Sequence, residues 1–274
     1  MTYARGWVPP TERQIIRALR TAHPEARNSA LLGIMAAAYA AIPRSSLPNP
    51  VLNQGQLGSC TANGWALALY VAMVKQGIPP FIAARLVIYY GERALEGRIN
   101  NDAGAAIADG AVFLASYGVP KESDWPYDIS KFTVAPGPQV AHDAYDGRGA
   151  VQVNYHPISS TGNKLISDIG AAVTAGFVPV FGCLVTEEFC SSQPSGTIHA
   201  PTGVAAGGHC EGVVIYDEAN ERVAVQNSWG REWGDPDPAL PPGCWWCGFD
   251  YVTDPNFGFS DIWIISALPQ GVGQ

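Results

Sequence analysis

The sequence predicts an α+β fold with two lobes, in which the helices come first and the strands follow. Two observations support this prediction. Up to about residue 119 the apolar residues recur at helical spacing, and after about residue 150 they form short β-branched runs separated by turn residues. The expected divisions are an N-terminal extension (1–46), a mainly helical lobe (47–150), a mainly β lobe (151–265) and a C-terminal tail (266–274).

The extension contains two helix-like stretches. Thr11, followed by Gln14, is typical of a helix start, and apolar residues continue after it at helical spacing. Residues 29–42 are small and apolar and contain an Ala-Tyr-Ala motif of the kind that precedes export cleavage. We expect a helix here and not an export signal, because this stretch begins well inside the chain and follows acidic residues. Residues 43–50 are rich in proline, which favours extended or turn structure.

A strong helix follows. Ser59 is a favourable N-cap, and Gly77 with Pro79 provides a stop signal. The residues between are apolar nearly all round, which is typical of a helix buried in the centre of a protein. Cys60 therefore lies in the first turn of a central helix.

Further elements follow in chain order. Residues 79–95 and 104–119 read as two more helices, the second ending at Gly118, and residues 122–128 read as a turn. The strand-like runs are 149–158, 179–186, 208–217 and 222–229.

Bulk composition excludes several classes of protein. Hydrophobic residues make up 47% of the chain and charged residues 15%, which is typical of a globular protein. The net charge of −8, without a cluster of Lys or Arg, argues against nucleic acid and anionic membranes as partners. No apolar run is long enough to span a membrane. We expect a cytoplasmic protein by default, with an exported or virion-associated protein as the alternative, and the sequence leaves the oligomeric state open.

The six cysteines do not require a disulfide framework. Cys244 and Cys247 form a Cys-Trp-Trp-Cys motif, which fits a redox pair, half of a zinc site or two unrelated thiols. Because there is no second motif of this kind, we expect neither a metal nor a cofactor.

Cys60 is either a nucleophile or a small buried apolar residue, the commoner fate of a free cysteine. A helix N-terminus favours the reactive thiolate, and catalysis needs a nearby imidazole that a third group orients. Of the five histidines, only His209 begins a strand whose return strand ends in a suitable side chain, Asn227. The two residues are symmetric about residue 218, so a regular hairpin places them on one face, although ordinary turn bonds at the strand ends are the alternative. The backbone N–H of Cys60 and the side-chain amide of Gln54 or Gln56 are candidate oxyanion donors.

Several motifs carry a family resemblance. "NQGQLGSC" (53–60), "GGHCEGVVIYD" (207–217) and "NSWGREWG" (227–234) resemble the nucleophile loop, the histidine strand and the asparagine motif of the papain-like cysteine peptidases. "SYGVPKESDWPYD" and "SDIWII" resemble further segments of that family, so the resemblance covers about residues 47–265.

The resemblance implies a peptidase that acts through a thioester, with a peptide or protein as its substrate. It implies Cys60 as the nucleophile, His209 as the base, Asn227 as the group that orients His209, and Gln54 as the oxyanion donor. Trp229 would shield the bond between His209 and Asn227 from water.

The resemblance also implies the substrate-binding residues. Gly104 and Ala105 would offer a backbone edge to an extended peptide. Gly208 and Cys210 flank His209, and the small apolar Cys210 would favour a hydrophobic side chain two residues before the cut bond.

Some residues depart from the family pattern. Thr61 stands where an aromatic residue is usual, Leu57 where many members have a disulfide cysteine, and Ala105 where glycine is usual. The extension is too short for the long inhibitory propeptide of the lysosomal members. The alternatives are therefore a papain-like fold that serves as a binding or structural component, for example of a viral particle, and acyl transfer to an amine.

Overall fold

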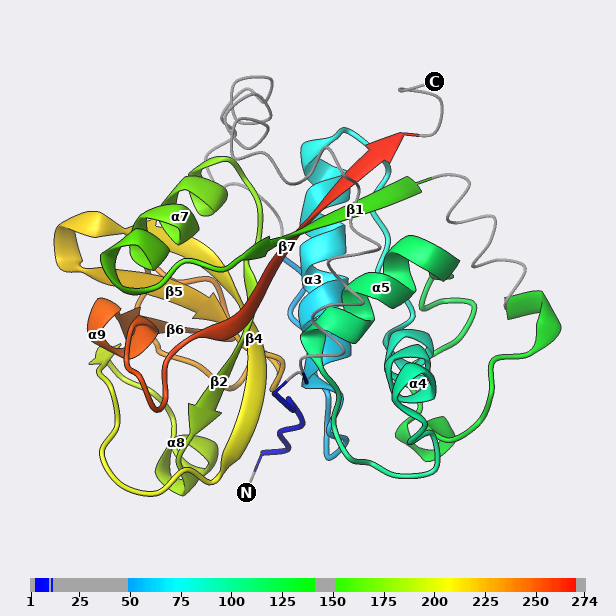
Figure 1. The fold of residues 1–274 in the computed structure, drawn as a ribbon, viewed down its shortest axis with the longest axis horizontal. Coiled ribbons are helices and arrows are strands. Elements are labelled where there is room, and N and C mark those ends of the chain that lie inside the picture. Colours follow the sequence, from blue (N-terminus) through cyan, green and yellow to red (C-terminus); the bar gives the residue numbers. More distant parts are fainter. Residues whose placement is uncertain (1–2, 10, 12–48, 141–150, 270–274) are drawn as a thin grey trace.

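The computed structural model describes residues 3–9, 11, 49–140 and 151–269. Within them the predicted α+β fold is confirmed, with helices first and the sheet after them (Figure 1). The helix predicted from Thr11 and the apolar stretch 29–42 lie outside the described residues. The helices are α3 (Cys60–Lys75), α4 (Arg85–Glu96), α5 (Ile107–Tyr117), α7 (Gly162–Thr174), α8 (Glu187–Ser191) and α9 (Phe249–Val252), with short 3-10 turns at Ile129–Lys131 and Glu218–Asn220.

The strands form one sheet in the order β1-β7-β2-β4-β5-β6-β3, in which only β3 and β6 pair in parallel. Strands β1 and β7 make a long antiparallel ribbon that leaves the rest of the sheet and runs beside α3 and α5 (Figure 1). The strands are β1 (Val151–Ile158), β2 (Val180–Val185), β3 (Thr197–Ile198), β4 (Gly207–Asp217), β5 (Arg222–Gln226), β6 (Cys244–Gly248) and β7 (Ser260–Pro269).

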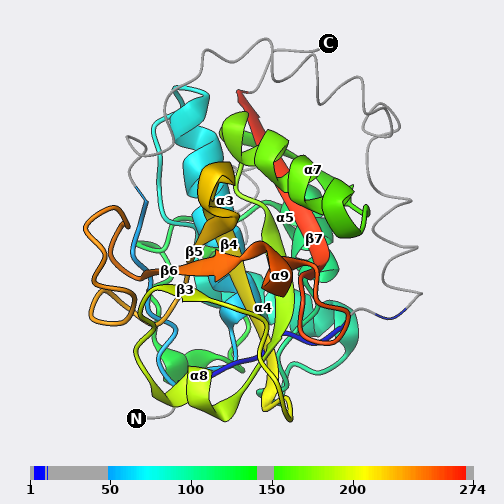
Figure 2. The ribbon, with the colours of Figure 1, turned by 90° about the vertical axis from the view of Figure 1, so that its left-hand side faces the viewer.

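The two faces of the sheet bury different cores. One face packs against α3 and α5, on which α4 packs in turn, and the other packs against α7 and α9. The view in Figure 2 looks from the side of α9 and α7, opposite the helices α4 and α5. The histidine strand β4 lies beside α3, at the boundary between the helical half and the sheet (Figure 1).

Helix α3 forms as the sequence predicts. It begins at Cys60, is buried along most of its length, and ends before Gly77, whose φ of 66° suits a glycine. Ser59 occupies the N-cap position but makes no capping bond, because its hydroxyl instead bonds the Tyr127 hydroxyl at 2.5 Å. The start of α3 therefore depends on a tertiary contact.

Four elements differ from the predictions. Helix α7 interrupts the strand-rich half, where no helix was expected. The Cys-Trp-Trp-Cys motif is a strand, β6, and β7 continues to Pro269, past the expected boundary at 265. The strand expected over 222–229 ends at Gln226, so Asn227 lies just beyond it.

Strand β6 separates its two cysteines. Cys244 and Trp246 belong to the core beside α3, whereas Trp245 and Cys247 belong to the core beside α7. Side chains three positions apart in a strand point to opposite faces, so the two thiols form neither a redox pair nor half of one zinc site. Across the described ranges the cysteines are free and no group of His, Cys, Asp and Glu is arranged to hold a metal ion.

No helix in the described part of the chain has both the length and the apolar content needed to cross a membrane.

Candidate active site

The loop before α3 is tied to both halves of the molecule. On the helical side, the Gly58 N–H donates to the Asp102 carboxylate at 3.0 Å, and the Tyr89 hydroxyl donates to the same carboxylate at 2.5 Å. On the other side, the Gln54 N–H donates to the carbonyl oxygen of Ser228 at 2.8 Å. These bonds fix the position of Cys60, which is fully buried at the first residue of α3.

His209 and Asn227 are hydrogen-bonded. The Nε2 of His209 lies 2.9 Å from the Oδ1 of Asn227, and both side chains are buried. The same Oδ1 accepts the Ser228 N–H at 2.6 Å, which establishes it as an acceptor. His209 therefore carries its proton on Nε2, and Nδ1, which has no partner among the described residues, is free to accept one.

The register behind this bond differs from the symmetric hairpin that the sequence predicts. Gly212 pairs with Gln226, and the ladder shifts between Val213 and Ile215. Continued past the end of β5, this register sets Asn227 opposite Glu211 and diagonal to His209. The predicted register was therefore wrong by two positions, but a shift of two keeps both side chains on one face of the sheet.

The sulfur of Cys60 lies close to the histidine strand, where the backbone N–H groups of Cys210 and Gly6 favour its charged form. Burial raises the pKa of the Cys60 thiol to about 12. Burial also lowers the pKa of His209 to about 4, against the opposing effect of the Asn227 bond. In this form of the protein both groups are neutral at pH 7, and the thiolate–imidazolium pair is absent.

The two candidate glutamines lie in different surroundings. Gln54 is fully buried; its Nε2 donates to the carbonyl oxygen of Leu57 at 2.9 Å, and its Oε1 accepts the Ser228 hydroxyl at 2.6 Å. Gln56 is exposed. The Leu57 bond uses one of the two N–H groups of the Gln54 amide, so the other remains for an oxyanion.

Trp229 covers His209. Its ring stacks on the imidazole with centroids 4.6 Å apart, and the Tyr3 ring stacks on Trp229, also at 4.6 Å. The Trp229 Nε1–H donates to the carbonyl oxygen of Ala4 at 2.9 Å. The bond between His209 and Asn227 therefore lies under aromatic side chains and away from water.

The N-terminal segment, defined here as residues 3–8, lies near the start of α3 (dark blue in Figure 1), between β4 and the stretch just before α5. The Ala105 N–H donates to the Gly6 carbonyl oxygen at 2.8 Å, and the Val8 N–H donates to the Ala105 carbonyl oxygen at 2.9 Å. On the opposite side, the Trp7 N–H donates to the Gly208 carbonyl oxygen at 3.2 Å. Residues 104–105 and Gly208, predicted to bind an extended peptide, thus bind the chain's own N-terminus.

The fit leaves no room for larger residues. Gly104 has a φ of 69°, and a Cβ on it would collide with the carbonyl oxygen of Gly6. Sequence reasoning did not foresee this contact, because nothing in the pattern of residues 3–8 indicates where an extended segment docks.

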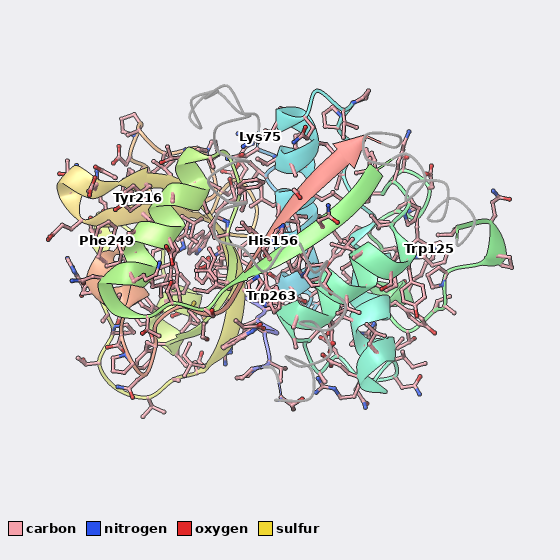
Figure 3. The ribbon with its side chains drawn as sticks, turned by 45° about the horizontal axis from the view of Figure 1, so that its top comes forward. Lys75, Trp125, His156, Tyr216, Phe249 and Trp263 are labelled. Carbon is pink, nitrogen blue, oxygen red and sulfur yellow. The ribbon has the colours of Figure 1, made fainter. Side chains whose placement is uncertain are left out.

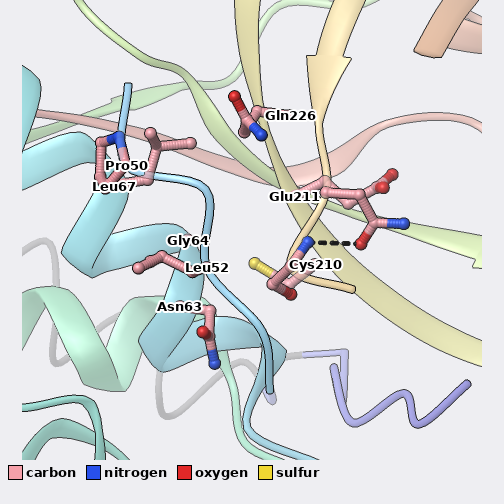
Figure 4. A pocket seen from close by; sticks show the side chains of 10 residues that line it. Pro50, Leu52, Asn63, Gly64, Leu67, Cys210, Glu211 and Gln226 are labelled. Carbon is pink, nitrogen blue, oxygen red and sulfur yellow. Dashed lines mark hydrogen bonds between the residues drawn. The ribbon is translucent and has the colours of Figure 1, made fainter. Parts of the chain in front are cut away.

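Cys210 and Glu211, the two residues that follow His209 on β4, line a small pocket together with Asn63 and Gly64 of α3 and Gln226 of β5 (Figure 4). A Cβ on Gly64 would be 3.2 Å from the Cys210 sulfur, so this thiol packs against α3. The Glu211 carboxylate accepts the Trp245 Nε1–H at 3.1 Å and lies 3.9 Å from the Nε2 of His209. Burial raises the pKa of Glu211 to about 8, so it is neutral at pH 7 and forms no ion pair with His209. Sequence reasoning passed over this buried acid.

Thr61 is turned toward α4. Its hydroxyl donates to the Glu92 carboxylate at 2.8 Å, and both side chains are fully buried. Burial raises the pKa of Glu92 well above its usual value. The Thr61 side chain thus forms a hydrogen bond inside the helical half, between α3 and α4.

Comparison with known proteins gives one relative of high similarity. The chain is 38% identical over 226 residues to an uncharacterized peptidase C1-like protein of Acanthamoeba polyphaga mimivirus, covering 79% of this chain and 70% of that protein. It is 25% identical to the gamete and mating-type specific protein A of Dictyostelium discoideum, over 70% of this chain but only 40% of that protein. No protein-family model matches the chain.

Solved structures agree with this result. Xylellain, a cysteine protease from Xylella fastidiosa, superposes with a TM-score of 0.77 at 27% identity, over 97% of each chain. The bromelain protease of Ananas comosus in complex with the E64 inhibitor superposes with a TM-score of 0.59 at 16% identity, over 84% of this chain and 98% of that one. The second likeness bears on the fold alone.

Proposed function

The chain belongs to the papain-like cysteine peptidases, and from that premise we propose that it hydrolyses peptide bonds of peptide or protein substrates through a thioester formed on Cys60. One observation carries the proposal: the Nε2 of His209 is 2.9 Å from the Oδ1 of Asn227, and the next residue of the same strand, Cys210, lies close to Cys60 at the first residue of a buried helix. Acyl transfer by a cysteine requires these three groups: a nucleophile, a base, and a group that orients the base.

Each residue has a stated role in the reaction. His209 accepts the Cys60 proton at Nδ1 as the sulfur attacks the peptide carbonyl carbon. The C–N bond then breaks, the amine leaves with the proton from His209, and the thioester remains. His209 next takes a proton from water, whose oxygen attacks the thioester carbonyl carbon. The C–S bond then breaks, the carboxylic acid leaves, and the proton on His209 returns to the Cys60 sulfur.

The oxyanion of each tetrahedral intermediate has two candidate donors. These are the backbone N–H of Cys60, at the start of α3, and the second N–H of the Gln54 amide. The bonds of Gln54 to Leu57 and Ser228 hold its side chain in one orientation, which suits a group that must be in place before charge develops.

The N-terminal segment blocks the reaction in the described form. It occupies Ala105 and Gly208 and buries Cys60, so a substrate has no access until the segment leaves. Its departure also admits water to Cys60 and His209, which returns both pKa values toward the range in which thiolate and imidazolium coexist.

The test is a reduced chain carrying Trp7→Ala, which removes the buried anchor of the N-terminal segment, assayed on a peptide library with E-64, an epoxide that traps thiols, located by mass spectrometry. We expect cleavage and a label on Cys60, and loss of both in Cys60→Ala. Cys247→Ala, which changes a buried thiol on β6, is the control and keeps both.

The other outcomes separate the alternatives. A label on a different cysteine, with Cys60 unmodified, contradicts the proposed nucleophile. A labelled Cys60 without cleavage of any peptide favours a binding or structural role, and amide products formed only when an amine is added favour acyl transfer.

A further inference from the structure

Glu211 is a buried acid beside the proposed catalytic pair, and the reaction steps given above leave it unused. It follows His209 by two positions on β4, so both side chains project from the same face of the sheet. Its Oε1 lies 3.9 Å from the Nε2 of His209, and its side chain is only 1% exposed. A buried carboxyl is unfavourable unless its oxygens are hydrogen-bonded, so its presence here calls for a physical reason.

The hydrogen bonding of Glu211 is half complete. Its Oε1 accepts the Trp245 Nε1–H at 3.1 Å. Among the described residues, neither its Oε2 nor the Nδ2 of Asn227 has a partner. Continued past β5, the register sets Asn227 opposite Glu211, and residues that face each other across strands have Cβ atoms about 5 Å apart. A buried acceptor and a buried donor without partners thus flank the bond between His209 and Asn227.

Strand β4 runs from His209, at the boundary between the halves, to the outer edge of the sheet, where Tyr216 stacks on Phe249 (left in Figure 3). On the neighbouring strand β2, Phe181 pairs with Glu211. An apolar side chain therefore faces this carboxyl on one side.

The titratable groups that face Glu211 from the surrounding elements are thiols and one phenol. They lie on β2, α8, β4, β6 and α9: Cys183, Cys190, Cys210, Cys247 and Tyr251. Burial raises the pKa of each of them, so all five are neutral at pH 7. None of them can neutralise a charge on Glu211, whereas a protonated His209 can.

A cation near His209 belongs to the N-terminal segment. Arg5 disfavours a second positive charge on His209 and so lowers its pKa, after the larger effect of burial. The Arg5 guanidinium donates to the Glu187 carboxylate at 2.8 Å. When the segment leaves the cleft, Arg5 leaves with it, and this repulsion of an imidazolium ends.

We propose that Glu211 is a positioning residue, and that its carboxylate is the counter-charge of the His209 imidazolium during the reaction. This rests on the proposed function, in which His209 takes the Cys60 proton at Nδ1. As the imidazolium forms, Glu211 releases its own proton to the water that enters the open cleft. Its Oε1 keeps the Trp245 bond, and its Oε2 accepts an N–H of the Asn227 amide. That bond keeps the Asn227 Oδ1 turned toward His209.

The charge has a measurable consequence. An opposite charge within about 4–6 Å favours the charged form of a group and shifts its pKa by about one to three units. The Glu211 carboxylate therefore raises the pKa of the imidazolium, and activity persists to a higher pH before His209 loses its proton. Glutamine keeps the shape and the Trp245 bond but carries no charge, so the alkaline loss of activity should come at a lower pH.

The experiment uses the full-length Trp7→Ala chain, with and without Glu211→Gln. The rate of Cys60 inactivation by E-64 and kcat/KM on one peptide are measured from acidic to alkaline pH. Both reactions need the imidazolium, which donates a proton to the epoxide oxygen or to the leaving amine. We expect the alkaline limit of both rates to fall by about one pH unit or more in Glu211→Gln. Glu188→Gln, at an exposed acid of α8, is the matched control and keeps the alkaline limit.

A second variant keeps Glu211 intact, in case its replacement prevents folding. Trp245→Phe removes the donor to Oε1, which makes the carboxylate less favourable, so the alkaline limit should fall in the same direction but by less. An alkaline limit equal to that of the parent in either variant, or a rate lowered by the same factor at every pH, overturns the proposal. Absence of peptide hydrolysis in every chain, with the E-64 limits still separated, overturns the peptidase function and leaves the role of Glu211 standing.

Discussion

The carbonyl oxygen of Gly6 lies 2.8 Å from the backbone nitrogen of Ala105, so the N-terminus of the chain occupies the edge that would bind a substrate. Tyr3, stacked on Trp229, and Trp7, buried against Gly182 and Gly208, hold the segment on either side of Gly6. The described form is therefore closed. We expect the reactivity of Cys60 to depend on how tightly residues 3–8 are held.

Trp7→Ala should open the cleft. Replacing a buried tryptophan with alanine costs about 3–5 kcal/mol of packing, and here the loss falls on the docked segment. We expect at least a tenfold faster reaction of Cys60 with E-64 and a matching rise in peptide hydrolysis. Trp125→Ala, which removes a partly exposed tryptophan from another loop, serves as the control. Unchanged labelling in Trp7→Ala would show that the segment does not limit access.

Asn227→Ala should impair the action of His209 as a base without weakening substrate binding. Without its acceptor, His209 loses the bond that sets its tautomer and ring orientation. We expect kcat to fall about 10²-fold with KM changed little, measured in the Trp7→Ala background. Asn220→Ala, on the exposed turn between β4 and β5, should keep its kcat. An equal kcat in the two asparagine variants would contradict the role of Asn227.

Gln54→Ala should lower kcat by about 10²-fold, because it removes a donor that acts on the oxyanion in the transition state. Gln56→Ala, the exposed neighbour, should react as the parent does. The measurement is steady-state kinetics on one peptide, with the active fraction titrated at Cys60. A Gln56 variant that loses more activity than the Gln54 variant would reverse the assignment.

Glu211→Gln should change how stability depends on pH. The folded-state pKa of Glu211 is raised to about 8 by burial, so the unfolded chain binds fewer protons than the folded one above the usual carboxyl pKa. The contribution of Glu211 is therefore present at low pH and is lost as the pH rises toward 8. Glutamine mimics the neutral acid and keeps an acceptor for Trp245, so the variant should match the parent near pH 5.

Near pH 8 the Glu211→Gln variant should be more stable by a few kcal/mol, on the order expected for a shift of this size. Chemical denaturation at several pH values measures the difference. His209, whose lowered pKa acts in the opposite sense at lower pH, is present in both chains and largely cancels. Glu188→Gln, at an exposed acid, should follow the parent curve. A variant that loses stability relative to the parent as the pH rises would exclude a raised pKa for Glu211.

The catalytic candidates could be predicted from the sequence for different reasons. Helix α3 was predicted because its apolar residues and terminal glycine are local signals, and Cys60 follows from where it starts. The contact between His209 and Asn227 was predicted from a hairpin whose register is wrong by two positions. The predicted contact still forms because a register shift of two positions keeps both side chains on the same face of the sheet.

Other features could not be predicted, because no local sequence pattern indicates them. The fully buried strand β6 lacks the alternation that marks a half-buried strand. Glu211 is buried beside His209 because β4 packs against both α3 and β5, and a single strand does not reveal what covers it. Asp261 accepts a hydrogen bond from the indole N–H of Trp7, a residue near the other end of the chain.

The sequence by itself determined the fold class, the central helix and the residues proposed as the triad, since apolar periodicity, the glycine stop signal and motifs act over short distances along the chain. Only the tertiary structure decided that residues 3–8 lie along Ala105 and Gly208 and that Asp261 accepts the indole N–H of Trp7. These contacts join segments of the chain that pattern does not connect. Their energies come from packing and hydrogen bonds that exist only after the two halves have formed.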